Sequence, residues 1–447
     1  MINNSDRHAF VNWFRSSSPY IHAFRGRTFV ITFGGEVAND ALFDSFLHDI
    51  ALLSSLGIRL ILVHGARPQI EACMKRNKET SHYENGIRIT DEKALTCVKE
   101  AVGTVRMEIE ALLSMGLANS PMAGARIRVT SGNFITAKPV GIKDGIDFQH
   151  TGEVRRVDTT AINQQLDHGA IVVLSPTGYS PTGEVFNLSA LEVATSIACE
   201  IKADKLLCLT DIKTIKNSKG RVTRQLTLSE AHALISSKRK HDEETLVHIH
   251  EAIRASQAGV RRTHLLNRHI DGILLMELFS RDGIGTMITA DAYESIRQAH
   301  IEDVGGIIEL ISPLENEGTL ARRSREQLEL EIDHFHVVER DGAIIACASL
   351  YPYLDEKCAE LACLAVHPDY QKSGWGNILL DRVTDIAKEM ELNILFALTT
   401  RTLHWFRERG FVSKDLSILP LKKRAMYNYQ RNSKVLIKTL DKNSKED

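Results

Sequence analysis

The feature that most restricts the fold of this chain is a regular alternation of short apolar runs, glycine turns and helical patterns in its first half. The run 28–33, TFVITF, is followed by Gly34 and Gly35, a helical pattern that Gly57 closes, and a second apolar run at 59–65. Apolar runs of this length, separated by helices, are typical of parallel strands joined by crossover helices. The sequence therefore predicts an α/β fold with an open, mostly parallel sheet.

The same alternation continues further along the chain. It predicts a strand at 169–176, a helix at 188–203, and strands at 205–211 and 272–278. After about residue 290 the pattern changes, and a new strand-and-helix unit begins near Ile296.

The length of 447 residues exceeds one typical hydrophobic core, so we expect more than one domain. Aromatic residues at helical spacing open the chain at 6–25, and serine and proline at 16–19 are expected to end that helix. We expect an N-terminal helix in 1–25, an α/β domain in 26–290 and a second α/β domain in 295–440.

The composition excludes several classes of partner and site. The formal net charge is −2, so no overall positive field would attract nucleic acid or an anionic membrane. The seven cysteines form no Cys-x-x-Cys pair, which argues against a disulfide framework or a zinc site and fits a cytoplasmic protein. His248 and His250 are two possible ligands without a third, so no metal is expected. No apolar run approaches the roughly 20 residues that span a bilayer.

A candidate phosphate-binding loop lies in the second half of the chain. Residues 371–376, Gln-Lys-Ser-Gly-Trp-Gly, place two glycines directly before an apolar stripe at helical spacing. Backbone N–H groups of such a loop, with a helix N-terminus behind it, can bind phosphate oxygens. A dinucleotide site would have an acidic residue about 20 residues later, and the strand expected at 393–400 has none. The loop therefore does not fit a dinucleotide fingerprint.

The segments around this loop resemble the GNAT superfamily of acetyl-CoA-dependent N-acetyltransferases. The resemblance rests on LAVHPDY (364–370), the loop Gln-x-x-Gly-x-Gly and WFRERGF (405–411), and it covers about residues 295–440. It implies a GNAT α/β domain in which the loop binds the pyrophosphate of coenzyme A. The implied coenzyme contacts are Leu364, Ala365, Val366, Gln371, Lys372, Ser373, Gly374, Trp375 and Gly376.

The first domain resembles the amino-acid kinase fold, most closely acetylglutamate kinase. The matching stretches include FVITFGG, LVHGARPQI, TGEVRRVD and LLMELFSRDGIGTMI. Where that family has a lysine before its first glycine pair, this chain has Thr32, and a second expected lysine is replaced within 246–256, where histidines stand. Threonine cannot supply the positive charge that stabilises a transferred phosphoryl group. We therefore expect 26–290 to be an amino-acid-kinase-like open sheet sandwich that is regulatory and silent as a kinase.

The two resemblances together indicate similarity to the bacterial N-acetylglutamate synthases. This implies the reaction acetyl-CoA + L-glutamate → N-acetyl-L-glutamate + CoA, the first step of arginine biosynthesis, with feedback regulation by L-arginine. The implied arginine contacts are Tyr20, Glu277 and Gly283, and a carboxylate such as Glu277 is a natural partner for a guanidinium group. The aromatic residues at 6–14 either pad the core or form a contact between subunits. The resemblance to arginine-sensitive kinases implies a homo-oligomer, for which a hexamer is the first hypothesis.

Acetyl transfer to an amine needs a base, donors for the oxyanion and a proton for the leaving thiolate. Glu360 is the candidate base, on the expected strand before the loop. Backbone N–H groups of Cys363 and Leu364 would bind the oxyanion. A covalent acetyl-cysteine at Cys363 is less favoured, because no partner histidine is evident and the resemblance implies direct transfer in a ternary complex. Thr399 or Thr400 would protonate the thiolate, unless water does so.

The resemblance also implies a pocket for the two carboxylates of glutamate. Its expected residues are Arg323, Cys363, Arg431 and Ser433, since arginine and neutral donors suit carboxylates.

Two other functions stay open. The chain could be an acetylglutamate kinase with an appended domain, which Thr32 argues against. It could also be a module that senses arginine or acetyl-CoA without turnover, which the complete loop and Glu360 argue against.

Overall fold

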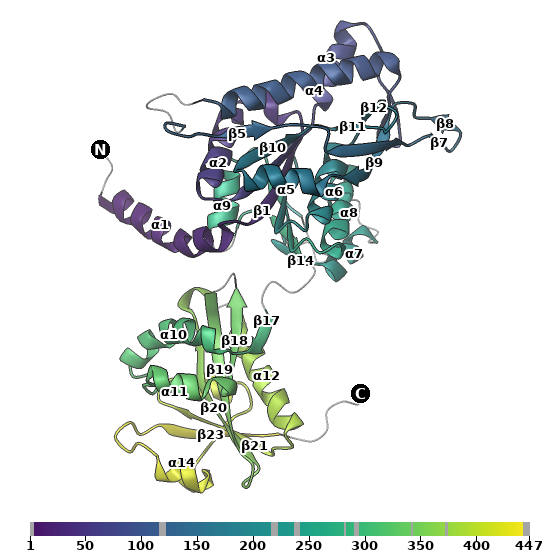
Figure 1. Ribbon diagram of the computed structural model, residues 1–447. Coiled ribbons are helices and arrows are strands. Elements are labelled where there is room, and N and C mark those ends of the chain that lie inside the picture. Colours follow the sequence, from purple (N-terminus) through teal and green to yellow (C-terminus); the bar gives the residue numbers. More distant parts are fainter. Residues whose placement is uncertain are drawn as a thin grey trace. The chain divides into compact units, whose positions relative to one another are not determined.

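The computed structural model describes residues 4–115, 122–215, 222–236, 242–280, 283–289, 295–340, 343–371 and 374–440. The chain divides into two compact units, residues 1–292 and 293–447 (Figure 1). Each unit has its own sheet and its own hydrophobic cores.

The first unit is built on a sheet of mostly parallel strands, of which the two at one edge run in the opposite direction. In spatial order its strands are β14 (Gln225–Thr227), β16 (Thr286–Thr289), β15 (Arg262–Asn267), β13 (Lys205–Thr210), β1 (Thr28–Phe33), β2 (Arg59–His64), β10 (Ala170–Leu174) and β5 (Arg128–Thr130). Every residue of β1 and β13 is buried, as expected for central strands that helices cover on both faces.

The two faces of this sheet carry different sets of helices (Figure 1). One face packs against α1 (Asn4–Phe24), α2 (Phe43–Ser55), α3 (Arg67–Arg76), α4 (Glu92–Leu113) and α9 (Ile273–Phe279). The other packs against α5 (Thr159–Asp167), α6 (Ala190–Glu200), α7 (Leu228–Ile235) and α8 (Glu243–Gln257). This sandwich confirms the predicted α/β class.

Short strands and a single 3₁₀ turn form the remaining regular structure that is described in this unit. A second sheet has the order β12 (Val185–Asn187), β11 (Thr177–Tyr179), β6 (Ile135–Pro139) and β9 (Gly152–Val157). Two hairpins join β3 (His82–Glu84) to β4 (Ile87–Ile89) and β7 (Ile142–Lys143) to β8 (Ile146–Asp147), and η1 spans Val37–Asn39.

Two expected elements differ in the structure. The expected strand at 272–278 is the helix α9, because an apolar run of seven residues does not by itself distinguish a strand from a buried helix. The first helix does not end at the serines but continues through Pro19 to Phe24. The Ser17 hydroxyl bonds to the carbonyl of Trp13 in its own helix and to that of Phe279 at the end of α9, so tertiary packing holds the helix together across the proline.

The second unit has a mixed sheet. Its order is β17 (Ser295–Gln298), β18 (Phe335–Arg340), β19 (Ala343–Tyr353), β20 (Cys358–Val366), β21 (Ile394–Thr399), β23 (Lys434–Thr439) and β22 (Val412–Lys414). Helix α12 (Trp375–Glu389) packs on one face, and α10 (Val304–Asn316) with α11 (Arg325–Leu330) on the other. The shorter elements are η2 (Ile301–Asp303), η3 (Ile332–His334), η4 (Pro368–Tyr370), α13 (Leu403–Arg407), η5 (Leu416–Ile418) and α14 (Leu421–Ala425).

Strands β20 and β21 diverge in the middle of this sheet. Their parallel pairing joins 358–360 to 394–396. Beyond Glu360, β20 keeps its pairing with β19, while β21 follows β23. The divergence leaves main-chain groups of β20 unpaired on its β21 side, directly after Glu360.

Candidate functional site

Two of the predicted catalytic residues, Glu360 and Cys363, lie on β20 where it diverges from β21. Glu360 is the last residue of β20 that pairs with β21. Cys363 follows three residues later, where β20 bulges against β19 and its φ is +51°. Left-handed backbone at a non-glycine residue redirects the neighbouring N–H groups. The bulge therefore reorients the amides that the sequence analysis assigned to the oxyanion.

Glu360 is a buried carboxylate with a cation beside it. Its residue is 5% exposed, and its Oε2 lies 2.7 Å from Nζ of Lys423 on α14. Burial raises the pKa of Glu360 above its usual value, although Lys423 and, more weakly, Arg323 act to lower it. A carboxyl group whose pKa is raised by burial is a stronger base when it is ionised, as a general base requires.

Cys363 is buried against a second thiol. The Cys347 thiol donates to the carbonyl of Cys363 at 3.4 Å. Its hydrogen bond to the Cys363 side chain lowers the pKa of that thiol, burial opposes this, and the charge of Arg323 lowers it further. No hydrogen bond joins Cys363 to a histidine in the part of the chain that the structure describes. The geometry of a thiol activated by a neighbouring base is absent there.

Two arginines lie at this site without a carboxylate partner. They are Arg323 and Arg431. Arg431 donates from Nη2 to the carbonyl of Thr319 at 2.6 Å, and its buried Nε has no hydrogen-bond partner. Burial lowers the pKa of Arg431, and the positive charge of Arg323 lowers it further. In 295–340, 343–371 and 374–440, neither guanidinium forms an ion pair. Two neighbouring unpaired guanidiniums constitute a site for an anion.

Arg323 links the arginine pair to the residues around Glu360. Burial acts to lower the pKa of Arg323, but its neighbours Cys363, Tyr351 and Glu360 raise it overall. Ser433, also predicted for the pocket, is buried, and its carbonyl accepts a hydrogen bond from Tyr427 at 2.7 Å.

The predicted proton donor lies at the end of β21. Thr399 is buried, whereas Thr400 is exposed. The Thr399 hydroxyl lies 2.8 Å from that of Thr402 and accepts a hydrogen bond from the Thr402 N–H at 3.0 Å. Of the two threonines, Thr399 is therefore the one held inside the unit.

The glycine loop leads directly into α12. Gly374 is the N-cap of this helix and has a φ of +86°, which favours glycine. A Cβ on Gly376 would lie 3.1 Å from the ring of Trp405, so the loop packs closely on α13. Lys372 and Ser373, which were predicted as coenzyme contacts, lie outside the described residues. The first N–H groups of a helix have no partner within it and remain available for an anion.

The remaining predicted coenzyme contacts are Leu364, Ala365 and Val366 on β20 and Gln371 before the loop. The three strand residues follow the bulge, where β20 has left β21, and Gln371 is exposed. Trp375 is buried and packs into the core beneath α12.

The predicted effector residues in the first unit lie around a buried polar network. The Glu277 Oε1 is 2.6 Å from Nδ1 of His264, and its Oε2 accepts hydrogen bonds from the N–H groups of Ile284 and Gly285, both at 2.7 Å. Burial acts to raise the pKa of Glu277, but these hydrogen bonds lower it to about 2. Glu277 is therefore an ionised carboxylate in the interior.

Gly283 and Tyr20 adjoin this network. Gly283 has a φ of +56°, and a Cβ there would lie 2.6 Å from Oε2 of Glu277. Tyr20 packs with Phe24 of α1 on the same core as α9. Sequence reasoning missed Lys205, whose Nζ lies 3.4 Å from Nε2 of His264 and 5.0 Å from the centre of the Phe24 ring.

Thr32, which stands where the amino-acid kinase family has its first lysine, is buried. Thr32 lies on β1 between Val63 of β2 and Cys208 of β13 and is 4% exposed. It supplies no charge at the glycine turn that follows.

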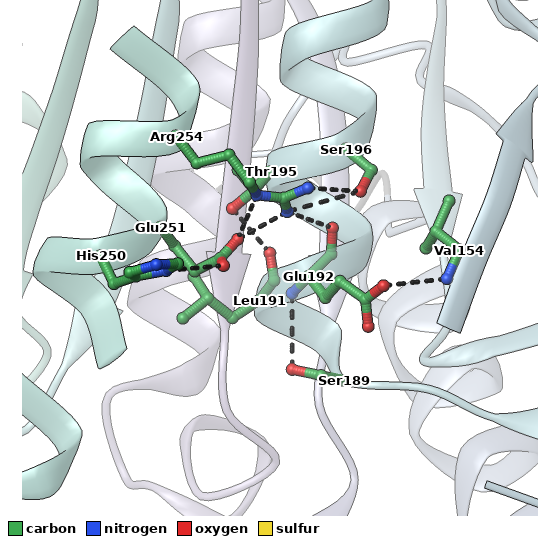
Figure 2. A network of polar contacts seen from close by, with 9 residues as sticks. All are labelled: Val154, Ser189, Leu191, Glu192, Thr195, Ser196, His250, Glu251 and Arg254. Carbon is green, nitrogen blue, oxygen red and sulfur yellow. Dashed lines mark hydrogen bonds and ion pairs between the residues drawn. The ribbon is translucent and has the colours of Figure 1, made fainter. Parts of the chain in front are cut away.

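The segment that should carry the second lysine lies in α8, and its charged groups engage α6 (Figure 2). Arg254 donates to Glu251 at 2.6 Å and reaches Ser196 and the Glu192 carbonyl, each at 3.4 Å. Glu192 in turn accepts the N–H of Val154 at 2.9 Å. This network joins α6, α8 and β9 and neutralises the cation of α8.

Two further observations concern metals and membranes. Within the described ranges, no cluster of three or more histidine, cysteine, aspartate or glutamate side chains is arranged to hold a metal ion. None of the helices that the structure describes is both long and apolar enough to span a bilayer.

The family models that match this chain follow its two units. The model of the amino acid kinase family matches residues 27–267, and the model of the acetyltransferase (GNAT) family matches residues 304–411. Both predicted fold resemblances are confirmed.

Curated relatives match over nearly the full length. The amino-acid acetyltransferase of Ectopseudomonas mendocina is 51% identical over 433 residues, which cover 97% of this chain and 100% of the relative. That of Escherichia fergusonii is 50% identical, with coverage of 96% and 98%.

Solved structures agree with the curated relatives. The N-acetylglutamate synthase from Neisseria gonorrhoeae, complexed with coenzyme A and L-arginine, is 40% identical and superimposes with a TM-score of 0.88 over 96% of this chain and 99% of that one. The same enzyme complexed with coenzyme A and N-acetyl-glutamate is similar over 97% of this chain and 100% of that one, with a TM-score of 0.61.

Proposed function

This chain belongs to the amino-acid acetyltransferase family, and we propose that it transfers the acetyl group of acetyl-CoA to the amine of L-glutamate. The products are N-acetyl-L-glutamate and CoA, and the reaction is the first step of arginine biosynthesis. The N-acetylglutamate synthase from Neisseria gonorrhoeae, which binds coenzyme A, L-arginine and N-acetyl-glutamate, supports this choice of ligands.

The arginine pair Arg323 and Arg431 is the observation that most supports glutamate as the acetyl acceptor. Arg323 and Arg431 lie close enough for their charges to interact, and neither has a carboxylate partner within the described part of the second unit. Two partly buried cations that lie side by side without a counter-ion destabilise each other unless an anion completes the site. An amino acid with two carboxylates satisfies both guanidiniums, and Ser433 adds a neutral polar group.

In the proposed mechanism, Glu360 removes a proton from the substrate ammonium, and the free amine attacks the thioester carbonyl directly. The N–H groups near Cys363 and Leu364 then donate to the oxyanion that develops, which lowers the barrier. Collapse of the tetrahedral intermediate releases the CoA thiolate, to which Thr399 or a water molecule gives a proton.

We assign coenzyme binding to the main chain of 364–366 and to the loop 371–376. The left-handed Gly374 and the N-terminus of α12 support this assignment, because they leave N–H groups available for a pyrophosphate. Acetyl-CoA is a co-substrate here, and the mechanism requires no metal.

We assign feedback regulation by L-arginine to the first unit. Tyr20, Glu277 and Gly283 would contact the effector, and Glu277 supplies an ionised carboxylate for its guanidinium. Thr32 is uncharged and Arg254 is paired with Glu251, so neither supplies a free cation for a phosphoryl group. This supports a unit that regulates without phosphoryl transfer.

We further propose a homo-oligomer, with a hexamer as the first hypothesis, that works in the cytoplasm. Trp13 and Phe14 of α1 are 45% and 56% exposed, and exposed aromatic residues on one helix suit a contact between subunits. All seven cysteines are free thiols, which is compatible with a reducing compartment.

The test is thiol release from acetyl-CoA with L-glutamate, L-aspartate, L-glutamine or no acceptor, each with and without L-arginine. We expect release that depends on glutamate and changes with arginine. Release that arginine leaves unchanged would retain the transferase and remove the effector assignment. Tight binding of acetyl-CoA without release under saturating substrates would favour a sensing module instead.

A further inference from the structure

Lys423 is the cation closest to the candidate base. It lies on α14, and its Nζ is 2.7 Å from Oε2 of Glu360, with 25% of the Lys423 side chain and 7% of the Glu360 side chain exposed. This is the one ion pair that Glu360 forms among 295–340, 343–371 and 374–440. The contact joins positions 63 residues apart in sequence, so no local pattern indicates it.

The other groups around Glu360 do not replace this contact. Arg323 lowers the pKa of Glu360 less than Lys423 does, and Glu331 raises it. Tyr351 lies opposite Glu360 on β19, where its hydroxyl donates to Glu331 at 2.6 Å.

The remaining neighbours of Glu360 are uncharged. Tyr353, also on β19, is close enough for the carboxylate to raise the pKa of its phenol. On β21 the residue paired with Glu360 is Phe396, which is buried and apolar. Lys423 is therefore the main compensation for the buried negative charge.

A base for this reaction must be ionised when the substrate ammonium arrives, because a protonated carboxyl group cannot accept the proton. Burial alone favours the protonated carboxyl. Lys423 opposes the effect of burial and contacts Oε2, so Oε1 is the oxygen that would accept a proton from the substrate.

We propose that Lys423 is a positioning residue for acetyl transfer, which keeps Glu360 ionised and turns one of its oxygens toward the acceptor amine. This inference rests on the proposed function. The proton moves from the substrate ammonium to Glu360, so the amine and the carboxylic acid form together, and Lys423 keeps its own protons throughout.

The test is the pH profile of kcat/KM for glutamate in the full chain, with the variants Lys423→Met and Lys423→Arg. Removal of the cation raises the pKa of the base. We expect the acidic limb for Lys423→Met to move to higher pH by about one unit or more. Activity should fall most below neutral pH and approach the wild-type value above the shifted limb. Lys423→Arg keeps the charge and should keep the wild-type limb.

The control is Lys422→Met, which removes an exposed lysine from the same helix and should leave the limb in place. A uniform loss at every pH in Lys423→Met, with an unmoved limb, would mean that Lys423 is merely structural. A higher KM for glutamate at every pH, again with an unmoved limb, would make it a substrate ligand. Either result overturns the proposal.

A replacement variant and the wild-type activity distinguish a folding defect and a wrong function from a wrong role for Lys423. If Lys423→Met does not fold, as judged by its thermal melt, the profile of Lys423→Gln replaces it. Wild-type protein without glutamate-dependent thiol release would overturn the proposed function itself, whereas an active wild type with unmoved limbs overturns the role of Lys423 alone.

Discussion

Two buried carboxylates, Glu360 and Glu277, have opposite pKa shifts, although they are 5% and 9% exposed. Glu277 receives three hydrogen bonds, from His264 and two main-chain N–H groups, and its pKa falls to about 2. Glu360 is paired with Lys423, and its pKa stays above the usual value. The number of donors, more than burial, distinguishes a carboxylate that is held ionised from one that can take up a proton.

We expect Cys363→Ala to retain acetyl transfer within about tenfold of the wild-type kcat. The main-chain N–H groups at this bulge remain when the thiol is removed, and direct attack needs no thiol. Loss of a true nucleophile would cost on the order of 10⁴-fold or more. Steady-state kinetics and mass spectrometry of the quenched enzyme decide this, and an acetylated Cys363 would establish the covalent route.

Asp49 on α2 predicts a pH-dependent stability. Burial, and then the negative charge of Asp271, raise its pKa to about 7. The folded state thus binds a proton that the unfolded state releases near pH 4, so stability falls as the pH rises from about 4 to about 7. Relative to wild type, Asp49→Asn should gain melting temperature progressively over that range and keep a constant gain above it. The exposed Asp44→Asn on the same helix is the control, and a gain independent of pH would contradict the assignment.

At the scale of elements, two left-handed glycines border the two proposed ligand sites. Gly374 ends the coenzyme loop and begins α12, and Gly283 follows α9 and borders the carboxylate of Glu277. Gly374 was predicted from the glycine loop before a helix, because a glycine there can adopt φ values that other residues avoid, whereas Gly283 was implied by the family resemblance alone. The contact that makes Gly283 necessary comes from α9, an element that was predicted as a strand.

Gly374→Ala should weaken coenzyme binding. At a φ of +86° a Cβ costs about 1–2 kcal/mol, which corresponds to an increase of about 5- to 30-fold in KM for acetyl-CoA if the loop relaxes. The KM for glutamate should change little. The matched control is Gly305→Ala, in α10, where no atom lies near the added Cβ. If both variants change the KM for acetyl-CoA equally, the loop has no specific role in coenzyme binding.

Gly283→Ala should remove the arginine response without loss of transferase activity. The added Cβ would lie 2.6 Å from Oε2 of Glu277 and displace the carboxylate. We expect the arginine concentration for half-maximal effect to rise at least about tenfold, with activity in the absence of arginine unchanged. The control Gly103→Ala lies in α4 with open space around its Cβ. An unchanged arginine response in Gly283→Ala would remove this residue from the effector site.

At the scale of the whole molecule, the chain joins an amino-acid-kinase-like unit with Thr32 at the lysine position to a unit that carries the residues we propose for acetyl transfer. The candidate base, the arginine pair and the coenzyme loop all belong to residues 293–447, and the effector residues to residues 1–292. Each unit has its own cores, so each site is built by the packing of its own elements.

We expect no phosphoryl transfer from ATP to N-acetyl-L-glutamate. Thr32 is buried and uncharged, and the cation Arg254 of α8 is neutralised by Glu251. Trapping of the acyl phosphate as a hydroxamate should give no signal above the enzyme-free control. A hydroxamate that accumulates in proportion to enzyme would restore the kinase hypothesis.

The sequence by itself determined the central strands β1, β2, β10 and β13, the glycine loop and the exchange of lysine for threonine, because these depend on neighbours within a few residues. The runs at β1, β2 and β13 are mainly apolar, as is typical of strands that helices cover on both faces of a sheet, and that pattern is visible without coordinates. Gly374 could therefore be named as a candidate from its place before a helix, and Glu360 from its strand together with the GNAT resemblance.

Tertiary structure alone decided which charges meet. The pairing of Lys423 with Glu360, the approach of Lys205 to His264 and the unpaired neighbours Arg323 and Arg431 each join distant segments. Packing also decided that α1 continues through its proline and that 273–279 is helical. The free energy of a charged side chain depends on how far it is buried and on which charges lie beside it. Both are established only when the chain has folded.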